Sequence, residues 1–357
     1  MEVTTMVRRL LISAGVLALS LWVVFGGLLH AQTLTDERFE KLAKELYPKA
    51  QQEGEVILYT SHDVEDVVAI FDAFRKQFPG IKTNYWQARA ADVISRVMME
   101  FQAGQASLDV IMGQSAAAIS KAAGAVMPYK LVQDDALILS DPSLPVVFLQ
   151  VQALAYNKEK LKGEDVPKKL EDVINAKYKG AVALDDPMRG SGMSIQLATL
   201  KEYWKDDARW TRFVKGLKDL NVPVHRSTGA MFRLLVSGEY SLALPAYLED
   251  IIDDREKGGI IDYVKSDPPI VSRQYAAIYA KSPHPNAAKL LVEWMVSPAG
   301  QTVLDSVRRT PSRKGFPSRK ASLELYWPPG TPIIAGELTE FLVDPKKWMD
   351  TYIKPIW

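Results

Sequence analysis

The chain has 357 residues, of which 47% are hydrophobic and 24% charged, and its formal net charge is +1. This length predicts two globular domains, and a nearly neutral chain without a basic run argues against nucleic acid as a partner, because phosphate binding needs clustered Lys and Arg. The absence of cysteine excludes thiol nucleophiles, cysteine–zinc sites, cysteine-ligated iron–sulfur clusters and a lipid on an N-terminal cysteine.

Residues 1–31 have the pattern of a secretory signal peptide. Arg8 and Arg9 precede an uncharged apolar run at 10–29, and a polar segment opens near Gln32. A basic start, an apolar centre and a small residue at the end are typical of an export signal. We therefore expect a mature protein that begins near Gln32, lies free in the periplasm and is not a lipoprotein. The apolar run is also nearly long enough to span a bilayer, so an uncleaved anchor stays an alternative.

A regular alternation of strand and helix patterns begins after a polar amphipathic helix predicted at 33–53. Each short apolar strand is followed at once by a segment with helical periodicity. The strands are predicted at 56–59, 81–85 and 108–112, and the helices at 63–78, at 90–101 and from 113. Asp63 is a suitable N-cap for the first of these helices. Such alternation predicts a parallel sheet with helical crossovers.

A second alternating unit follows the first. Its strands are predicted at 181–184, 222–225 and 241–244, with one helix that continues to about 204 and another at 231–236. Long apolar runs at 148–156 and 271–280 flank this unit, and a further helix is predicted at 285–296. Two α/β units joined by long apolar connectors predict two lobes with a cleft between them.

Polar residues follow the strands of the first unit where each strand ends. Ser61 and His62 follow the first strand, Trp86 and Arg89 the second, and Gln114 the third. Ligands of open α/β sheets bind beyond the carboxyl ends of the strands. We therefore expect these residues at the mouth of a binding site. Trp86 and Arg89 are the weaker candidates, and packing within the lobe is the alternative for Trp86.

A catalytic triad of Ser61, His62 and Asp63 is not expected. Three adjacent residues cannot place a nucleophile, a base and an orienting carboxylate in one hydrogen-bonded row. The sequence also contains no Gly-x-Ser-x-Gly motif and no zinc-binding histidine pair at helical spacing. We therefore expect no enzyme activity and no cofactor.

Two helix starts in the second unit are candidate anion sites. Ser191, Gly192 and Met193 follow a strand and open a helix, and Ser227 stands at a second helix start. Free N–H groups and the helix dipole favour an anion at such positions. Simple N-capping is the alternative for each serine. Arg189 could bind a carboxylate or phosphate bidentately, or else face solvent.

Six segments in a consistent order resemble the periplasmic solute-binding proteins of ABC importers, in the type 2, ferric-ion-binding-like group. They are GEVILYTSHD at 54–63, the strand at 108–111, YKGAVALDDPMRGSG at 178–192, VSGEYSLALPAY at 236–247, SPHPNAAKLLVEWMVSPAGQTVL at 282–304 and RRTPSRKG at 308–315. The resemblance covers roughly residues 54–320 and leaves 321–357 unmatched.

The resemblance implies a type 2, two-lobe α/β fold in which each lobe is a mostly parallel sheet flanked by helices. The apolar runs at 148–156 and 271–280 would be two strands that cross between the lobes as a hinge. It further implies a monomer that closes its lobes on a ligand and delivers it to an ABC permease in the inner membrane. The expected boundaries are a helix at 32–53, lobe 1 at 54–150 and 280–320, lobe 2 at 158–270, and a C-terminal extension at 321–357.

In ferric members of that group, one His, one Glu and two adjacent Tyr hold the metal. By resemblance, His62 matches the histidine and Tyr247 the first tyrosine, whereas Gly113 stands in place of the glutamate and Leu248 in place of the second tyrosine. Fe³⁺ is a hard ion that needs such anionic oxygen ligands. Ferric iron held with an exogenous anion or chelator is therefore the alternative, and Tyr247 could instead contact an organic ligand or be structural.

The anion subsite of the group matches this sequence better than its metal ligands do. The resemblance therefore implies a small anionic organic solute, phosphorylated or carboxylated. An exported enzyme or a sensor ectodomain is the alternative from another class. The ligand-binding residues expected from the matched subsite and the strand ends are Ser61, His62, Gln114, Arg189, Ser191, Gly192, Met193, Ser227 and Tyr247.

Overall fold

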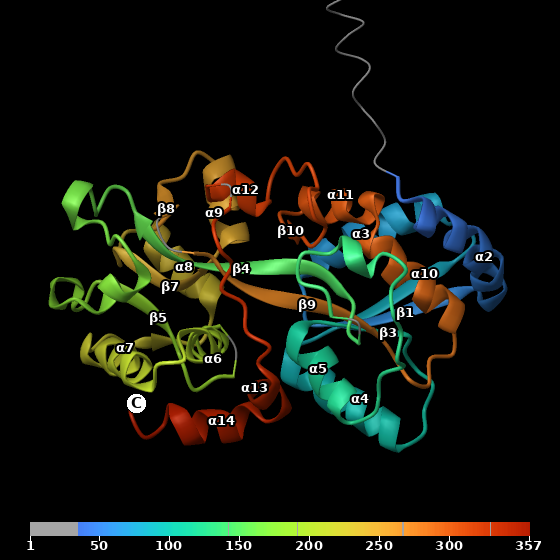
Figure 1. Ribbon diagram of the computed structural model, residues 1–357, viewed down its shortest axis with the longest axis horizontal. Helices are drawn as coiled ribbons and strands as arrows, with labels where there is room; N and C mark the ends of the chain where they lie inside the picture. Colours follow the sequence, from blue (N-terminus) through green and yellow to red (C-terminus); the bar gives the residue numbers. More distant parts are fainter. Residues whose placement is uncertain (1–34, 142, 191, 266–267, 329) are drawn as a thin grey trace, which may run out of the picture. The chain divides into compact units, whose positions relative to one another are not determined.

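The computed structural model describes residues 35–357 except 142, 191, 266–267 and 329 (Figure 1). Asp36–Trp357 forms one compact unit. The signal peptide predicted at 1–31 and the candidate Ser191 lie outside the described residues. Within the described part of the chain, no helix has both the length and the apolar character needed to cross a bilayer.

One sheet runs through this unit, and its ten described strands follow the order β2-β1-β3-β9-β4-β7-β5-β6, with β8 and β10 paired to β4. β1 pairs in parallel with β2 and β3, and β5 pairs in parallel with β6 and β7. The strands are β1 (Glu55–Thr60), β2 (Lys82–Gln87), β3 (Val110–Met112), β4 (Val146–Asn157), β5 (Val182–Asp185), β6 (Val224–His225), β7 (Leu242–Tyr247), β8 (Ile261–Tyr263), β9 (Ile270–Ile278) and β10 (Thr310–Pro311).

The long strands β4 and β9 connect the two sets of parallel strands (Figure 1). They pair with each other in antiparallel register from Val146↔Tyr275 to Gln152↔Ile270. The end of β9 pairs with β3, and the end of β4 pairs with β7. They therefore cross between lobe 1, which contains β1–β3, and lobe 2, which contains β5–β7. The predicted two-lobe α/β fold with two crossing strands is confirmed.

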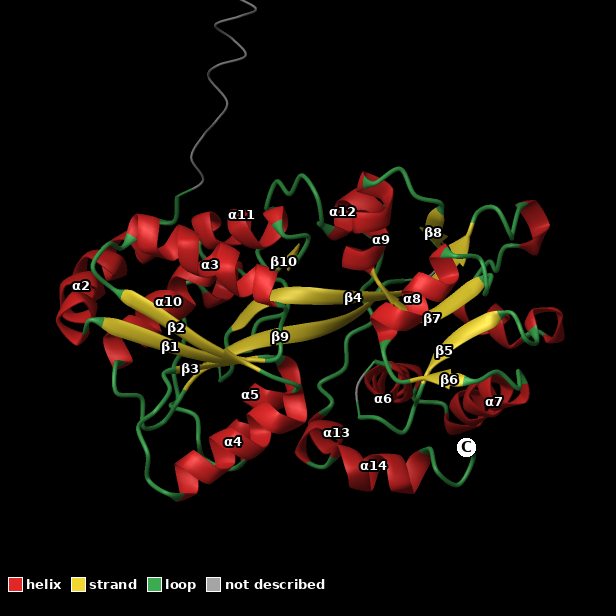
Figure 2. Cartoon of the chain, turned by 180° about the vertical axis from the view of Figure 1, so that it is seen from behind, coloured by secondary structure: helices red, strands yellow, loops and turns green. Residues whose placement is uncertain are grey.

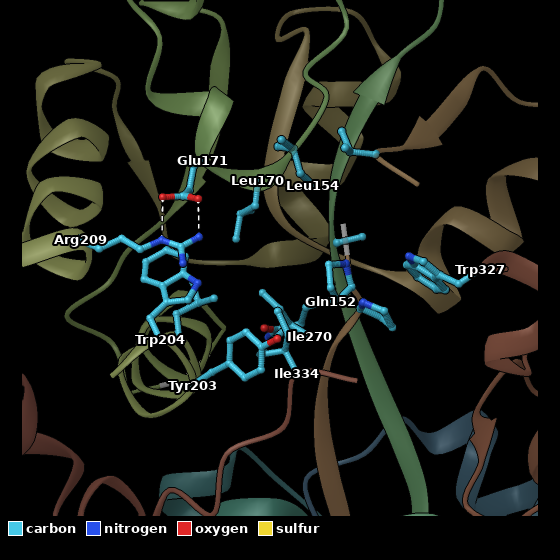
Figure 3. A pocket seen from close by; sticks show the side chains of 15 residues that line it. Gln152, Leu154, Leu170, Glu171, Tyr203, Trp204, Arg209, Ile270, Trp327 and Ile334 are labelled. Carbon is cyan, nitrogen blue, oxygen red and sulfur yellow. Dashed lines mark hydrogen bonds and ion pairs between the residues drawn. The ribbon is translucent and has the colours of Figure 1, made fainter. Parts of the chain in front are cut away.

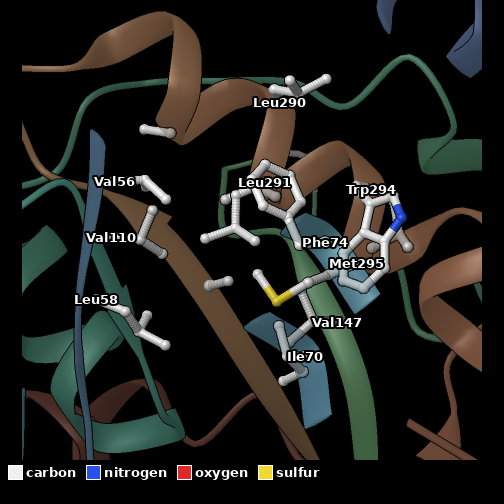
Figure 4. Packing of buried hydrophobic residues seen from close by; sticks show 14 of the residues in the cluster. Val56, Leu58, Ile70, Phe74, Val110, Val147, Leu290, Leu291, Trp294 and Met295 are labelled. Atoms are coloured by element: carbon white, nitrogen blue, oxygen red, sulfur yellow. The ribbon is translucent and has the colours of Figure 1, made fainter. Parts of the chain in front are cut away.

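Lobe 1 has helices on both faces of its strands because strand residues alternate between two hydrophobic clusters. Val56 and Leu58 point to a cluster with α2, α3, α10 and α11, whereas Tyr59 joins a cluster with α4 and α5 on the other face (Figure 2). In the first cluster, the rings of Phe74 and Trp294 lie 5.6 Å apart (Figure 4). The helices are α2 (Glu37–Glu53), α3 (Val64–Gln77), α4 (Ala90–Gln102), α5 (Gln114–Ala122), α10 (Pro285–Val296) and α11 (Pro298–Ser306).

Lobe 2 is built in the same way. Val182 and Leu184 of β5 point to a cluster with α6 and α7, and Ala183 between them points to a cluster with α8 and α9. The helices are α6 (Met193–Trp204), α7 (Asp207–Asp219), α8 (Thr228–Val236) and α9 (Leu248–Glu256), and the short 3₁₀ turns of the chain are η1 (Asp134–Ala136), η2 (Gly163–Asp165), η3 (Leu170–Ile174) and η4 (Ala176–Tyr178).

The last residues of the chain, which match no predicted motif, pack mainly on lobe 2. Phe341 and Trp348 belong to the hydrophobic cluster of α6 and α7. Ile334 forms a parallel bridge with Ile270 of β9, and α13 also contacts α5 of lobe 1. This segment is therefore part of the core of lobe 2. Its helices are α12 (Leu323–Tyr326), α13 (Thr339–Val343) and α14 (Pro345–Tyr352).

Candidate functional site

The three lobe 1 candidates gather where β1 ends and α5 begins. Ser61 and His62 follow β1, and Gln114 is the first residue of α5. A Cβ on Gly113 would lie 3.0 Å from Ser61 Oγ, so the glycine lets the two segments approach closely. The backbone N–H of Gln114 donates to Oε1 of Gln274 on β9, 3.2 Å away.

His62 is buried and uncharged. Its side chain packs on Phe148 of β4, with the rings 4.9 Å apart, and the Arg309 guanidinium lies 5.7 Å from the centre of the same ring. Burial and the positive charge of Arg309 lower the pKa of His62 to about 3. Its Nε2 is buried without a hydrogen-bond partner among the described residues. A neutral imidazole with a free nitrogen can accept a proton donor or bind a metal ion.

A row of polar side chains on the crossing strands joins the two lobes. Gln150 and Ser272 are register partners, and Gln274 Nε2 lies 3.4 Å from Gln150 Oε1 and 3.3 Å from Ser272 Oγ. Gln150 Nε2 donates to Glu249 Oε1 of lobe 2 over 2.9 Å. None of these residues was among the predicted site residues. The signal was the occurrence of two glutamines, Gln150 and Gln152, two positions apart in an otherwise apolar run.

The start of α6 already holds a carboxylate of the protein itself. The fully buried Asp185 accepts the Met193 N–H at Oδ2 over 3.0 Å, and a Cβ on Gly192, at φ +49°, would lie only 2.0 Å from that oxygen. Nη1 of Arg189 lies 3.3 Å from Asp185 Oδ1. Burial raises the pKa of Asp185 to about 6, although the Met193 N–H opposes the shift. Gly192, Met193 and Arg189 therefore do come together, but around an internal anion.

The start of α8 lies beside the start of α6 and has a different charge balance. A Cβ added at Gly192 would lie 3.4 Å from Cγ2 of Thr228. The Ser227 hydroxyl accepts a hydrogen bond from the Ala230 N–H over 3.2 Å. Ser227 therefore makes the N-capping contact that was the alternative to anion binding. The Arg233 side chain reaches back to this helix start, because a Cβ added at Gly229 would lie 3.8 Å from its Nη1. Among the described residues, neither Arg226 nor Arg233 has a carboxylate partner.

Tyr247 stands at the end of β7, opposite Gln152 of β4. Burial and the negative charges of Glu249 and Asp185 raise the pKa of its phenol, which therefore stays protonated at neutral pH. Gly113 and Leu248 supply no metal ligand. Across the residues that the structure describes, no group of three or more His, Asp or Glu has the arrangement of a metal site.

Arg309 connects the two lobes through a cluster of carboxylates. Its guanidinium donates to Asp66 and Asp63 at the start of α3, both over 2.9 Å, and to Glu249 of α9 over 2.6 Å. Asp63 therefore stands at the predicted N-cap position, but its side chain makes no capping hydrogen bond and pairs with Arg309 instead. Burial raises the pKa of Asp66 to about 6, against the lowering effect of Arg309.

The two weaker candidates have other partners. The ring of Trp86 lies 5.3 Å from that of Tyr59, and the Arg96 guanidinium covers it at 4.5 Å. Arg89 has an 88% exposed side chain and pairs with Asp92 over 2.9 Å. No described contact links Trp86 or Arg89 to the other predicted site residues. The remaining described candidates gather on both sides of the crossing strands.

Comparisons with known proteins agree with the two-lobe fold. The model of the family "Bacterial extracellular solute-binding protein" matches residues 62–302. Iron-bound HitA from Pseudomonas aeruginosa has a similar structure (TM-score 0.68, 18% identity, 85% of this chain and 99% of HitA covered). AfuA from Actinobacillus pleuropneumoniae, with exogenous fructose-6-phosphate bound, is also similar, with a TM-score of 0.68 and 18% sequence identity. The match covers 84% of this chain and 99% of AfuA. The Trichodesmium protein IdiA (FutA), in complex with iron and citrate, matches with a TM-score of 0.65 and 18% sequence identity. The match covers 83% of this chain and 98% of the Trichodesmium protein. No curated protein matches the sequence.

Proposed function

Because this chain belongs to the family of bacterial extracellular solute-binding proteins, we propose that it captures an anionic organic solute as the exported component of an ABC importer. It binds the solute between its lobes, closes on it about β4 and β9, and passes it to the permease without chemical change. The export signal at 1–31, the monomeric state and the contribution of Ser191 are parts of this proposal.

The observation that carries the anionic ligand is the unbalanced positive charge at the start of α8. Arg226 and Arg233 have no carboxylate partner among the described residues, and the helix dipole adds to their field. The start of α6 is less suited to an external anion, because Asp185 already accepts its Met193 N–H. We therefore place the anionic group of the solute nearer Ser227 than Met193, with Gln114 and Ser61 facing it from lobe 1.

Reversing the charge at Arg226 should weaken solute binding about 30-fold. The residue is exposed, so a charge pair at 4 Å is worth only ~1 kcal/mol in water, and loss of attraction plus new repulsion amounts to ~2 kcal/mol. Native mass spectrometry of freshly purified protein identifies the solute, and calorimetry then compares wild type with Arg226→Glu.

Arg319→Glu is the matched control for this experiment, since it changes the net charge equally at another exposed position. It should bind the solute like the wild type. Equal affinities of both variants and the wild type would show that the α8 start does not hold the anion. A solute without any negative group would refute the anionic class altogether.

Chelated ferric iron is the second candidate, and the free Nε2 of His62 favours it. The neutral ring keeps a lone pair for a metal, while the protonated Tyr247 and the residues Gly113 and Leu248 leave the other positions to a chelator. Ferric citrate should therefore bind more tightly than iron offered by a weak donor, and without an intense tyrosinate–iron band. Absorption spectra of wild type and Tyr247→Phe check this expectation. A strong visible band that is present in the wild type and absent from Tyr247→Phe would mean that the protein binds iron directly and tightly through Tyr247.

A further inference from the structure

A cavity of about 230 Å³ lies within lobe 2 (Figure 3). Its walls come from β4, η3, α6, α7, β9 and the residues just before β9, together with Trp327 and Ile334 of the C-terminal segment. Tyr203, at 45% exposure, lies at its edge. None of the described residues predicted for the interlobe site lines this cavity. Gln152 contacts both regions, because it lines the cavity and its Nε2 donates to the Gly192 carbonyl over 3.3 Å.

The surface of the cavity is apolar and aromatic. Leu154, Leu170 and Ile270 form aliphatic walls, and Trp204, Tyr203 and Trp327 contribute rings. The Arg209 guanidinium stacks on Trp204 at 4.4 Å. Flat rings on a site favour a flat aromatic ligand, which gains both burial and ring contacts.

The charged groups of the cavity neutralise each other. Arg209 binds Glu171 through two parallel hydrogen bonds, of 3.0 Å from Nε and 2.6 Å from Nη2 (Figure 3). Among the residues that the structure describes, these are the two charged ones that line the cavity. A charged ligand would lose its hydration and find no unpaired opposite charge among the described lining residues, which makes its binding unfavourable. The preferred ligand is therefore uncharged.

The volume limits the size of that ligand. An engineered apolar cavity of about 150 Å³ binds benzene, whereas sites for drug-sized ligands are of roughly 300 Å³ or more. At about 230 Å³ the cavity falls between these cases. We propose that it is a second binding site, separate from the interlobe cleft, for a small uncharged aromatic molecule of one or two rings.

The test uses indole, which is uncharged, and indole-3-acetate, which carries a carboxylate on the same ring system, both titrated into the full chain by calorimetry. Indole should bind with a Kd below ~1 mM, and indole-3-acetate at least about tenfold more weakly. Leu170→Trp fills the cavity from η3 and should weaken indole binding at least about tenfold. Leu325→Trp is the control, because Leu325 is 52% exposed and does not line the cavity.

Three outcomes would overturn the proposal. Indole that does not bind below the millimolar range would show that the cavity takes no such ligand. Equal binding of the two probes would refute the argument from charge. Equal losses of indole binding in Leu170→Trp and Leu325→Trp would place the indole elsewhere. Thermal melts of both variants establish that each is folded at the titration temperature.

Discussion

Replacing Arg309 with methionine should lower the free energy of unfolding by about 3–5 kcal/mol at pH 8, since it leaves a buried ion-pair cluster without its cation. The Arg309 side chain is 8% exposed and those of Asp66 and Glu249 are 4% and 15% exposed. Burial alone would lower the pKa of Arg309, but Glu249 and Asp66 raise it, so the guanidinium stays charged at every pH of interest. Methionine fills much of the volume and removes only the charge and the donors.

The loss of unfolding free energy in Arg309→Met should become smaller as the pH falls towards 5. The pKa of Asp66 is already raised to about 6 by burial, and without Arg309 it must rise further. The carboxyl then takes up a proton below neutral pH and no longer carries an uncompensated charge. Urea unfolding at pH 5 and pH 8 measures the difference.

Arg308→Met is the matched control, because the neighbouring Arg308 also bridges the lobes but only at 3.6 Å from Glu65, 3.7 Å from Asp253 and 3.7 Å from Glu256. Such looser pairs contribute about 0–1 kcal/mol. Similar small losses in both variants would mean that the cluster around Arg309 does not stabilise the fold.

Replacing Asp250 with asparagine should stabilise the protein by roughly 2–4 kcal/mol at pH 8 and leave it unchanged near pH 4. Burial and the negative charge of Glu249 raise the pKa of Asp250 to about 7, against the opposing charge of Arg309. One pKa unit corresponds to about 1.4 kcal/mol, and solvent contact of the partly exposed carboxyl reduces the total. Asparagine keeps the shape without the charge.

The sign of this effect follows from the direction of the pKa shift. The folded-state pKa of Asp250 lies above the ordinary value of 3.8, so the folded protein holds the proton more tightly than the unfolded chain. That contribution to stability is complete below about pH 4 and is lost as the pH rises through about 7. Urea unfolding of wild type and Asp250→Asn from pH 4 to pH 9 measures it.

Asp253→Asn on the same helix is the control for Asp250→Asn. Asp253 pairs with Lys257 over 2.6 Å, and its side chain is 35% exposed. This variant should change stability by less than about 1 kcal/mol at either pH. A destabilised Asp250→Asn at pH 8 would mean that the carboxylate has a favourable partner in the folded protein.

Periodicity in the sequence was enough to predict most elements around the site. β1, α3, α4 and α10 were expected because their apolar residues repeat at strand or helix spacing, which depends only on neighbours along the chain. The two crossing strands were predicted for the same reason, from long apolar runs. α7 was not among the predicted elements, although Trp210, Phe213 and Leu217 recur at helical spacing. Its Gly216 has a tertiary role, since a Cβ there would lie 2.7 Å from Ile174 Cβ.

The sequence by itself determined the alternation of strands and helices, and hence the polar positions at the strand ends where Ser61, His62 and Gln114 lie. Only the tertiary structure decided which charges occupy those positions. Asp185 accepts the Met193 N–H from eight residues further along the chain, and Arg309 meets Asp66 across 243 residues of sequence. Hydrogen bonds and buried ion pairs need atoms within about 4 Å. Such contacts arise only once the chain has folded, whereas helical and strand periodicity is already present in the local sequence.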